Sequence, residues 1–413
     1  MIAEILAVGT ELLLGDIANT NAQFLSKTLA ALGISVYGHT AVGDNPTRLT
    51  AAMNHAFNKA DLVIACGGLG PTLDDITKDI AAAYFGVEMV MDEDSWKAIQ
   101  KRFKGRKLPE NAKRNAVVPK GSKILPNNHG SAPGVCFEAG GKTLILLPGP
   151  PSELEPMFIK YAVPFLRQKT DKAFVSRTLK IVGLGESQVE TILQDLIEAQ
   201  TNPTIAPYAK QTEVALRITA SGKDEAAANI LIDPVAAEIY NRLSQHIYGE
   251  DDEIMAKIIL NSLEASQKTL AIAESCTGGL LASAFVDIPG SSATLLEGAV
   301  TYSNDAKTAR LGVPKDLLNT HGAVSPQVAA AMAEGIARTS SADIGISTTG
   351  VAGPGGGTPE KPVGLVYIGL HFNSVNNNNG KPTKTKELRL IGDRNEIRAR
   401  AVVAALDMLR TSL

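Results

Sequence analysis

Short apolar runs that end in glycine-bearing turns place the strongest constraint on the fold of this chain. Three of them, Ile2–Val8, Asp61–Cys66 and Leu144–Leu147, lie in the first third, and segments with helical spacing follow the first two. A short continuous apolar run is typical of a strand buried in a parallel sheet, and alternating strands and helices predict an α/β domain with a doubly wound sheet. Ligands on such sheets bind beyond the carboxyl ends of the strands, so the turns after these runs are candidate binding loops.

The length of the chain requires more than one domain. It has 413 residues, and hydrophobic residues make up 44% of them, which is enough for several cores. We expect an α/β domain over residues 1–168, a small α+β connector over 169–250 and a second α/β domain over 251–413.

Charge and cysteine content exclude several classes of protein. The formal net charge of −3 argues against a general nucleic-acid-binding surface. The three cysteines, Cys66, Cys136 and Cys276, are far apart and predict neither a disulfide framework nor a CxxC metal site, as expected in a reducing compartment. No run of about eighteen apolar residues exists, so the sequence predicts no membrane span and a cytoplasmic protein.

A glycine-rich turn, CGGLGPTLDDITKD, follows the second apolar run. The spacing of Gly67, Gly68 and Gly70 lets backbone N–H groups approach an anion, and the start of the following helix favours negative charge. The turn matches neither the dinucleotide-binding GxGxxG pattern nor the GK[ST] of a P-loop. It therefore predicts a phosphate-binding loop of another class.

Carboxylates near this loop allow two interpretations. Asp74 and Asp75 stand at a helix start, where they can simply stabilise the helix dipole. Alternatively, one of them holds a divalent cation beside the phosphates, because hard cations take oxygen ligands. Glu11 and Asp16, in the turn after the first strand, are candidate ligands for the same cation.

Two further segments are strongly polar. The Lys/Arg-rich stretch Lys97–Lys123 is either a solvated helix and loop or the basic wall of the phosphate site. The segment 373–385, NSVNNNNGKPTKT, is predicted to be a polar hairpin loop between two strands.

The stretch Ala273–Lys307 gathers two serine-bearing turns, a tyrosine and a lysine. An apolar strand leads into the first turn, which contains Ser275, and the second turn places Ser292 ahead of Tyr302 and Lys307. A serine and a lysine together can act as nucleophile and base. The plainer interpretation is that the serines cap helices and the lysine is solvated.

These motifs, in this order, resemble the CinA family of competence/damage-inducible proteins. GTELLLGDIANTN, GGLGPTLDDIT, SAPG and LPGPPSE resemble its amino-terminal domain, which is similar to the molybdopterin-binding MoaB/MogA fold. ESCTGG, GSSA, TYSNDAK, HGAVS, TGVAGPGGG, KPVG and GDR resemble its carboxy-terminal domain, a nicotinamide-nucleotide amidohydrolase. The segment between them resembles the KH-like connector of the family, but it lacks a GXXG loop, so we expect no nucleic-acid binding there.

The resemblance implies that the carboxy-terminal domain hydrolyses nicotinamide mononucleotide (NMN) to nicotinate mononucleotide and ammonia. No set of His, Cys and Asp residues in this part of the sequence has metal-ligand spacing, so we expect the amidase to need no metal. The resemblance also implies Ser292 as nucleophile, Lys307 as base and Tyr302 as an orienting or relaying group, with Ser275 as the alternative nucleophile. Lys307 needs a pKa lowered by burial or by a positive neighbour to act as a base. The substrate-binding residues that the resemblance implies are Thr277, Gly278, Thr349, Gly350 and Arg394.

For the amino-terminal domain the resemblance implies ADP-ribose pyrophosphatase activity with a divalent metal ion. The implied phosphate-site residues are Gly67, Gly68, Gly70, Thr72 and Asp75, with Glu11, Asp16 and Glu153 nearby. Two segments differ from the family pattern. Asn111–Ala116 stands where the family tends to have Arg-Gln-Ala, and Ser131 stands where threonine is expected.

The expected partners are therefore small nucleotides, NMN and ADP-ribose, and the resemblance also implies a homodimer. The rival class is a non-enzymatic binding protein, either for a molybdopterin-like ligand or for a competence-linked protein partner. A third alternative is that the amino-terminal domain has lost its activity.

Overall fold

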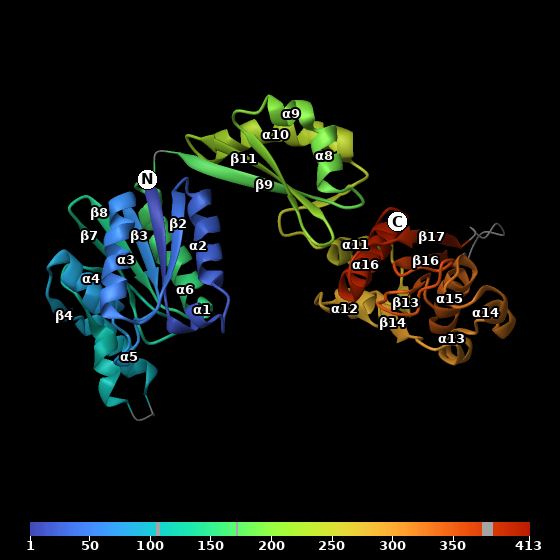
Figure 1. Ribbon diagram of the computed structural model, residues 1–413, viewed down its shortest axis with the longest axis horizontal. Helices are drawn as coiled ribbons and strands as arrows, with labels where there is room; N and C mark the ends of the chain where they lie inside the picture. Colours follow the sequence, from blue (N-terminus) through green and yellow to red (C-terminus); the bar gives the residue numbers. More distant parts are fainter. Residues whose placement is uncertain (105–107, 171, 374–382) are drawn as a thin grey trace. The chain divides into compact units, whose positions relative to one another are not determined.

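The computed structural model describes residues 1–104, 108–170, 172–373 and 383–413 (Figure 1). Part of the predicted basic stretch and most of the predicted hairpin loop 373–385 lie outside these residues. The chain divides into two compact units, Met1–Ser176 with Ala220–Leu231 and Arg177–Thr219 with Ile232–Leu413. In the part of the chain that is described, no helix is both long and apolar enough to cross a membrane.

A six-stranded sheet in the order β2-β1-β3-β8-β7-β6 forms the centre of the amino-terminal domain. β2, β1, β3 and β8 pair in parallel, and β7 and β6 extend the sheet with antiparallel pairing. The strands are β1 (Ile2–Val8), β2 (Ser35–Val42), β3 (Leu62–Cys66), β6 (Lys123–Leu125), β7 (Gly134–Ala139) and β8 (Lys142–Leu147), with a separate ribbon of β4 (Met89–Met91) and β5 (Val117–Pro119). The predicted α/β class is confirmed.

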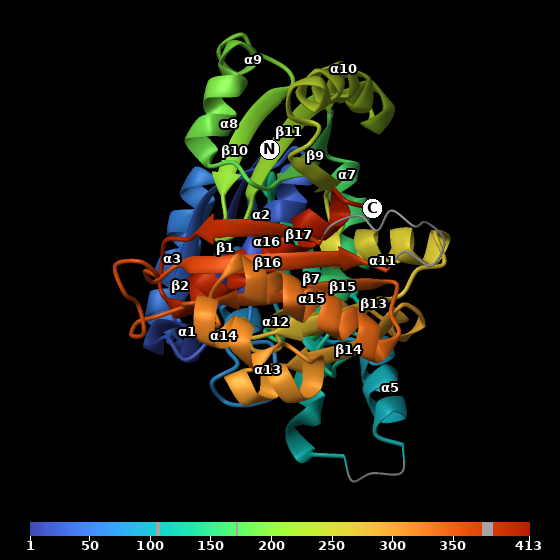
Figure 2. The same ribbon diagram turned by 90° about the vertical axis from the view of Figure 1, so that its right-hand side faces the viewer.

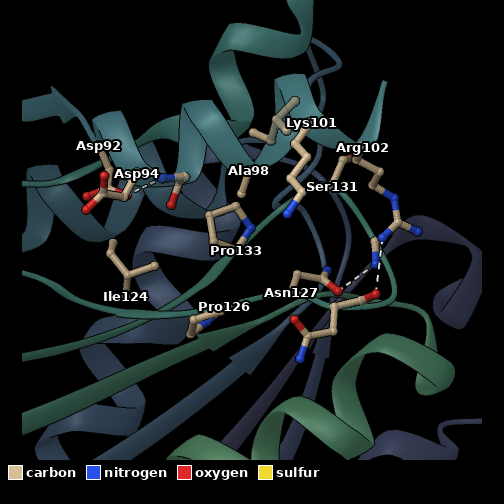
Figure 3. A pocket seen from close by; sticks show the side chains of 14 residues that line it. Asp92, Asp94, Ala98, Lys101, Arg102, Ile124, Pro126, Asn127, Ser131 and Pro133 are labelled. Carbon is tan, nitrogen blue, oxygen red and sulfur yellow. Dashed lines mark hydrogen bonds between the residues drawn. The ribbon is translucent and has the colours of Figure 1, made fainter. Parts of the chain in front are cut away.

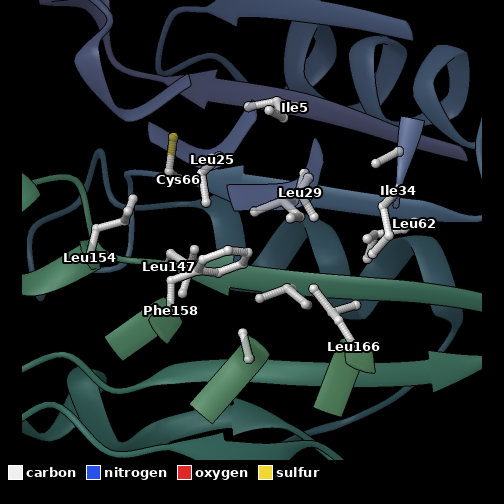
Figure 4. Packing of buried hydrophobic residues seen from close by; sticks show 14 of the residues in the cluster. Ile5, Leu25, Leu29, Ile34, Leu62, Cys66, Leu147, Leu154, Phe158 and Leu166 are labelled. Atoms are coloured by element: carbon white, nitrogen blue, oxygen red, sulfur yellow. The ribbon is translucent and has the colours of Figure 1, made fainter. Parts of the chain in front are cut away.

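Helices cover both faces of this sheet (Figure 1). The helical elements of the domain are α1 (Thr10–Leu14), α2 (Thr20–Ala31), α3 (Pro46–Lys59), α4 (Thr77–Phe85), α5 (Glu93–Arg102), η1 (Glu110–Ala116), α6 (Pro151–Met157), η2 (Phe158–Ala162) and α7 (Val163–Arg167), of which α5 and η1 pack against each other in a separate cluster. On one face Leu29 of α2 and Phe158 of η2 pack with Ile5 of the sheet (Figure 4). On the other, Met53 and Phe57 of α3 pack with alternate strand residues, because successive side chains of a strand point to opposite faces.

The connector is a four-stranded sheet with helices, in the strand order β10-β11-β9-β12. Its elements are β9 (Ala173–Ile181), α8 (Glu186–Ile192), α9 (Gln194–Glu198), β10 (Thr204–Ala209), β11 (Val214–Gly222), α10 (Glu225–Leu243) and β12 (Ile247–Glu250). The predicted small α+β unit is confirmed.

The carboxy-terminal domain contains a five-stranded sheet in the order β14-β13-β15-β16-β17 (Figure 2). β14, β13 and β15 are parallel, whereas β16 and β17 are antiparallel to their neighbours. α11, α12 and α16 pack on one face, and α13, α14 and α15 pack on the other. The elements are α11 (Met255–Ala265), β13 (Leu270–Glu274), α12 (Leu280–Val286), η3 (Ser291–Ala293), β14 (Leu295–Val300), α13 (Asn304–Leu311), α14 (Lys315–His321), α15 (Pro326–Ser340), β15 (Ile344–Gly350), β16 (Leu365–Phe372), β17 (Lys384–Arg389) and α16 (Arg394–Arg410).

The turn after β3 requires glycine at position 67. Gly67 has a φ of +103°, and a Cβ there would lie 2.0 Å from the carbonyl oxygen of Val8. Its N–H donates to the carbonyl oxygen of Leu147 at 3.0 Å, which fixes the turn between the ends of β1 and β8. A side chain at this position would force the loop away from the strands.

We predict that Gly67→Ala destabilises the amino-terminal domain more than Gly141→Ala does. Gly141 also has a positive φ, but its Cβ would meet open space, so alanine there adds only backbone strain, about 1 kcal/mol. The backbone clash at Gly67 should more than double that loss. The measurement is urea unfolding followed by the fluorescence of Trp96, which is the one tryptophan of the chain and lies in this domain. Equal losses in the two variants would contradict the prediction.

Candidate functional site

A polar pocket opens at the carboxyl ends of the three parallel strands of the carboxy-terminal domain. Its volume is about 200 Å³. The residues that line it are Ser275, Cys276, Tyr302, Lys307, Ala323, Val324, Thr349, Gly350, Ala352 and Arg394. They come from segments more than a hundred residues apart, because parallel pairing brings the ends of β13, β14 and β15 to one edge of the sheet.

Lys307 of α13 is the buried basic residue of this pocket, with only 1% of its surface exposed. Its Nζ lies 3.0 Å from Ser275 Oγ, 2.8 Å from the carbonyl oxygen of Thr301 and 3.2 Å from that of Tyr302. Burial lowers the pKa of Lys307 from 10.5 to about 8. A neutral amine has two N–H groups, which can donate to the two carbonyls, and one lone pair, which then faces the hydroxyl of Ser275.

Ser275 is held at the end of β13 by the backbone. Its N–H donates to the carbonyl oxygen of Thr348 at 2.9 Å, which extends the pairing of β13 with β15 by one residue. The chain then turns through Gly278 and Gly279, with φ values of +62° and +96°, into α12. This turn leaves the serine side chain facing Lys307 rather than the core.

Glu274 fixes this turn, and the sequence analysis missed it. The carboxylate is buried and accepts hydrogen bonds from the N–H groups of Gly279, Leu281 and Ala282 at 2.8–3.0 Å. These are N–H groups at the start of α12, so they are not available to bind the phosphate of a ligand. The detectable signal was a glutamate at the end of an otherwise apolar strand, directly before a turn into a helix.

The predicted pairing of Ser292 with Lys307 is wrong. Ser292 is exposed in η3, before β14, whereas the pocket lies after the carboxyl ends of the strands. β14 runs parallel to β13, and at about 3.3 Å per residue it places Ser292 roughly 16 Å or more from the pocket edge. Ser275, the alternative nucleophile, is the serine that contacts Lys307.

Arg394 and Tyr302 stand together at the pocket. Arg394 is the first residue of α16, and its Nη1 donates to the carbonyl oxygen of Gly353 at 2.6 Å. Its Nη2 lies 3.4 Å from the hydroxyl oxygen of Tyr302, whose side chain is largely exposed. The pair therefore presents a fixed positive charge and an accessible aromatic ring to a ligand.

The other predicted residues of this domain differ in their placement. Thr349 and Gly350 line the pocket, although the Thr349 hydroxyl donates to the carbonyl oxygen of Ala323 at 2.7 Å. Thr277 and Gly278 do not line it. Thr277 is buried, its hydroxyl lies 2.6 Å from that of Thr348, and its carbonyl accepts from Arg398, so its role here is to shape the turn.

Cys276 also lines the pocket but is a poor nucleophile. Burial raises the pKa of its thiol to about 12, which keeps it protonated. A buried amine on a serine hydroxyl, beside a cationic and an aromatic side chain, is instead an arrangement for nucleophilic attack by serine on an acyl group.

A second cleft, of about 340 Å³, lies at the carboxyl ends of β1, β3 and β8 in the amino-terminal domain. Gly67, Gly68 and Gly70 line it, as predicted, and the carboxylates in its lining are those of Glu11, Asp44, Asp74, Asp75 and Glu153. Thr72 and Asp16 are not among its lining residues. Thr72 acts instead on Asp75, because its N–H (2.9 Å) and its hydroxyl both donate to Asp75 Oδ2 and close the loop.

Glu11 and the two loop aspartates, Asp74 and Asp75, are the predicted metal ligands that line this cleft. Within the described residues, no three His, Cys, Asp or Glu side chains converge to hold a metal on their own. Mg²⁺ commonly binds one or two carboxylates and completes its shell with substrate phosphates and water. The chemistry of Glu11 and Asp75 fits that mode, whereas Asp16 lies outside the cleft.

Side chains of the segment η1 form hydrogen bonds to the backbone of the glycine-rich loop. Asn111 Nδ2 donates to the carbonyl oxygen of Pro71 at 3.3 Å, and Arg114 donates to that of Thr72. Asn115 Nδ2 donates to Ser131 Oγ at 3.0 Å. The two segments that differ from the family pattern are thus in direct contact with each other.

Lys78, which the sequence analysis also missed, ties η1 to the start of α4. It is buried, and its Nζ donates to the carbonyl oxygens of Arg114 at 2.8 Å and Asn115 at 3.2 Å. Burial lowers the pKa of Lys78 to about 8.

Three family models match the chain. The CinA C-terminal domain matches residues 252–413, the model described as "Probable molybdopterin binding domain" matches 4–168, and the KH domain of damage-inducible protein CinA matches 176–249.

Solved structures of similar proteins cover part of the chain. A competence/damage inducible protein from Agrobacterium tumefaciens is 44% identical, covers 38% of this chain and 91% of its own, and has a TM-score of 0.35. A CinA protein from Thermoplasma acidophilum is 35% identical, covers 38% of this chain and 94% of its own, and has a TM-score of 0.37.

Full-length relatives share about half of their residues with this chain. A competence-damage inducible protein of Clostridium beijerinckii is 50% identical over 415 residues, which cover 100% of both chains. A CinA-like protein of Dictyoglomus turgidum is 49% identical over 415 residues, which cover 100% of this chain and 99% of its own. The chain therefore belongs to the CinA family of competence/damage-inducible proteins.

Proposed function

We propose that the carboxy-terminal domain hydrolyses the carboxamide of NMN to nicotinate mononucleotide and ammonia. The observation that carries this proposal is the contact of 3.0 Å between Lys307 Nζ and Ser275 Oγ in a polar pocket. Amide hydrolysis by this route needs a nucleophile with an adjacent base that works near neutral pH. Membership of the CinA family is consistent with the proposal.

In this mechanism Ser275 Oγ attacks the carboxamide carbon while its proton passes to Lys307 Nζ. The tetrahedral intermediate collapses when the Lys307 ammonium gives that proton to the leaving nitrogen, which departs as ammonia. Water then attacks the resulting ester, and Lys307 takes the proton from the water and returns it to Ser275 Oγ. The products are the carboxylic acid, which gives its proton to the released ammonia and becomes the carboxylate, and the regenerated serine, so one water is consumed for each ammonia released.

Arg394 and Tyr302 select the nucleotide in this proposal. Arg394 donates one of its N–H groups to the carbonyl oxygen of Gly353. A guanidinium has five N–H donors, so the remaining ones can bind the ligand phosphate. Tyr302 is 63% exposed, and its ring can stack on the cationic pyridine ring of NMN.

We further propose that the amino-terminal domain hydrolyses the diphosphate bond of ADP-ribose. The glycine-rich loop offers backbone N–H groups for the phosphates, and Glu11 and Asp75 would hold a divalent cation with them. When bound, such a cation would neutralise charge on the phosphate oxygens. Glu153 also lines the cleft. Its carboxylate accepts a hydrogen bond from Asn127 Nδ2 at 2.7 Å and can orient the attacking water.

We predict that Ser275→Ala and Lys307→Met each lower the kcat for NMN by about 10⁴-fold, because each removes one half of the nucleophile–base pair. Ser292→Ala, a serine that lies at the other edge of the sheet, is the matched control and should retain full activity. The measurement is ammonia release from NMN by the full chain. Loss of activity in Ser292→Ala with retention in Ser275→Ala would reverse the assignment.

The pH dependence follows from the lowered pKa of Lys307. The base must be neutral, and the neutral amine predominates only above its pKa of about 8. We therefore expect kcat/KM for NMN to rise about tenfold per pH unit below pH 8 and to level off above it. The measurement is a pH–rate profile between pH 6 and pH 10. A profile that is flat or falls from pH 6 to pH 8 would exclude Lys307 as the base.

For the amino-terminal domain we predict that AMP release from ADP-ribose requires a divalent metal and is abolished by a chelator. Asp75→Asn and Glu11→Gln should each lower it at least about tenfold, because each removes a charged cation ligand. Asp16→Asn is the matched control, since Asp16 does not line the cleft. Equal activity in all three variants would remove these carboxylates from the mechanism.

A further inference from the structure

The pocket at Ser275 is too small to enclose a whole nucleotide. Its volume is about 200 Å³, whereas the cavity between α5 and the loop that follows β6 has a volume of about 660 Å³ (Figure 3). Sites that enclose most of a small organic ligand have volumes of roughly 300–1,000 Å³. A nucleotide whose carboxamide lies at Ser275 therefore extends beyond the pocket, and its phosphate lies at the rim.

The loop between β15 and β16 holds a lysine near this rim. Lys361 belongs to the KPVG motif at the end of the loop, which the proposed mechanism does not use. The loop is closed at its base, because the N–H of Gly364 donates to the carbonyl oxygen of Val351 at 2.8 Å. The N–H of Lys361 donates to Thr358 Oγ1 at 3.1 Å, and its carbonyl oxygen accepts from the Thr358 N–H at 3.0 Å. These bonds fix the backbone from which the lysine side chain extends.

The side chain of Lys361 reaches a second unused motif, HGAVS. Its Nζ donates to the carbonyl oxygen of His321, the last residue of α14, at 2.6 Å. Gly322 has a φ of +71°, and a Cβ there would lie 2.8 Å from Lys361 Nζ and displace the ammonium group. The next two residues, Ala323 and Val324, line the pocket. The ammonium group therefore lies beside a segment that forms part of the pocket wall.

Lys361 keeps both charge and donors for a ligand. An ammonium group has three N–H donors, and the carbonyl oxygen of His321 accepts from one of them. Lys361 is half-buried, and in the part of the chain that the structure describes it forms no ion pair, not even with its neighbour Glu360. A cation that has no carboxylate partner at the edge of a pocket can bind an anion without first breaking an ion pair.

Two other positive groups lie at the same rim. Arg394 lines the pocket and donates to the carbonyl oxygen of Gly353, in the same loop as Lys361. Among the described residues Arg394 likewise has no carboxylate partner. The N-cap of α15, Ser325, follows directly after the pocket residue Val324, and the N-terminus of a helix carries partial positive charge. The rim is thus positive on the side of the loop and on the side of α15.

We propose that Lys361 binds the phosphate of the nucleotide together with Arg394, and that this contact makes the site select nucleotides over nucleosides. The carboxamide lies at Ser275, the ring lies beside Tyr302, and the phosphate lies between the ammonium and guanidinium groups. This assignment rests on the proposed amidase function for the identity of the substrate. Binding of the phosphate by the two cations does not itself require hydrolysis.

The test compares Lys361→Gln with Lys315→Gln in the full chain. Glutamine at position 361 keeps an N–H donor for the carbonyl oxygen of His321 but removes the charge, and Lys315 is an exposed lysine at the other end of α14. Ammonia release is measured with NMN and with nicotinamide riboside, which lacks the phosphate. We expect Lys361→Gln to lower kcat/KM for NMN at least about tenfold, mainly through KM, and that for the riboside less than about twofold. Lys315→Gln should change neither, and Lys361→Arg should keep most of the activity on NMN.

The riboside separates phosphate binding from a structural role. If Lys361 only caps α14, its loss affects both compounds alike, and such an equal loss would overturn the proposal, as would an unchanged KM for NMN in Lys361→Gln. Where the riboside is not hydrolysed, its affinity, measured by calorimetry, takes the place of its rate. Lys361→Met, judged by the same ratio of NMN to riboside, replaces Lys361→Gln if circular dichroism shows that the latter is misfolded.

Calorimetry also separates this proposal from the proposed hydrolysis. A chain that releases ammonia from neither compound rejects the amidase function, and the two compounds are then compared by their affinities alone. Binding of NMN that is at least about tenfold weaker in Lys361→Gln and unchanged in Lys315→Gln would support the phosphate contact without the amidase function. Equal binding of NMN by the natural chain and both variants, or no binding by the natural chain, would overturn the assignment of Lys361.

Discussion

The burial of the Lys307 amino group against Ser275 is the interaction on which the carboxy-terminal site depends. No carboxylate contributes to the lowered pKa of Lys307, and its hydrogen-bond partners are two backbone carbonyls and one hydroxyl. Removing a charged amine from water without an opposite charge favours its neutral form. The neutral form is the one that can take a proton from serine. The fold therefore creates the base by packing α13 against the ends of the strands.

A second buried lysine shows why burial alone does not make a catalytic site. Lys78 also has a pKa lowered to about 8 by burial, and it also donates to two backbone carbonyls. Within the described residues, however, Lys78 Nζ forms no hydrogen bond to a hydroxyl, so the lone pair of a neutral Lys78 has no nucleophile to activate. Lys78 ties α4 to η1 and so supports the glycine-rich loop. The chemical difference between the two sites is the single oxygen that Ser275 supplies to Lys307.

The sequence allowed most of this arrangement to be predicted, and the failures have physical causes. Lys307, Tyr302, Thr349 and Arg394 do line one pocket, and the α/β class follows from the apolar runs and their turns. Ser292 was misplaced because its nearness in sequence to Lys307 does not show that the two residues lie on opposite sides of β14. Ser292 comes before this strand and Lys307 comes after it. A residue before a parallel strand lies at the opposite edge from a residue after it. The contacts of Lys78 could not be predicted, because it binds backbone carbonyls, which have no sequence signature. Glu274 was overlooked although its position at the end of an apolar strand, directly before a turn into a helix, was a signal.

The loop beside the glycine-rich cleft depends on small residues. Gly130 has no room for a Cβ beside Glu153, and Ser131 lacks the methyl group of the threonine expected at its position. Asn115, in the other segment that differs from the expected pattern, holds the Ser131 hydroxyl in place. The two segments that differ from the expected pattern therefore form one local contact, in which a buried amide fixes the hydroxyl that stands in place of threonine.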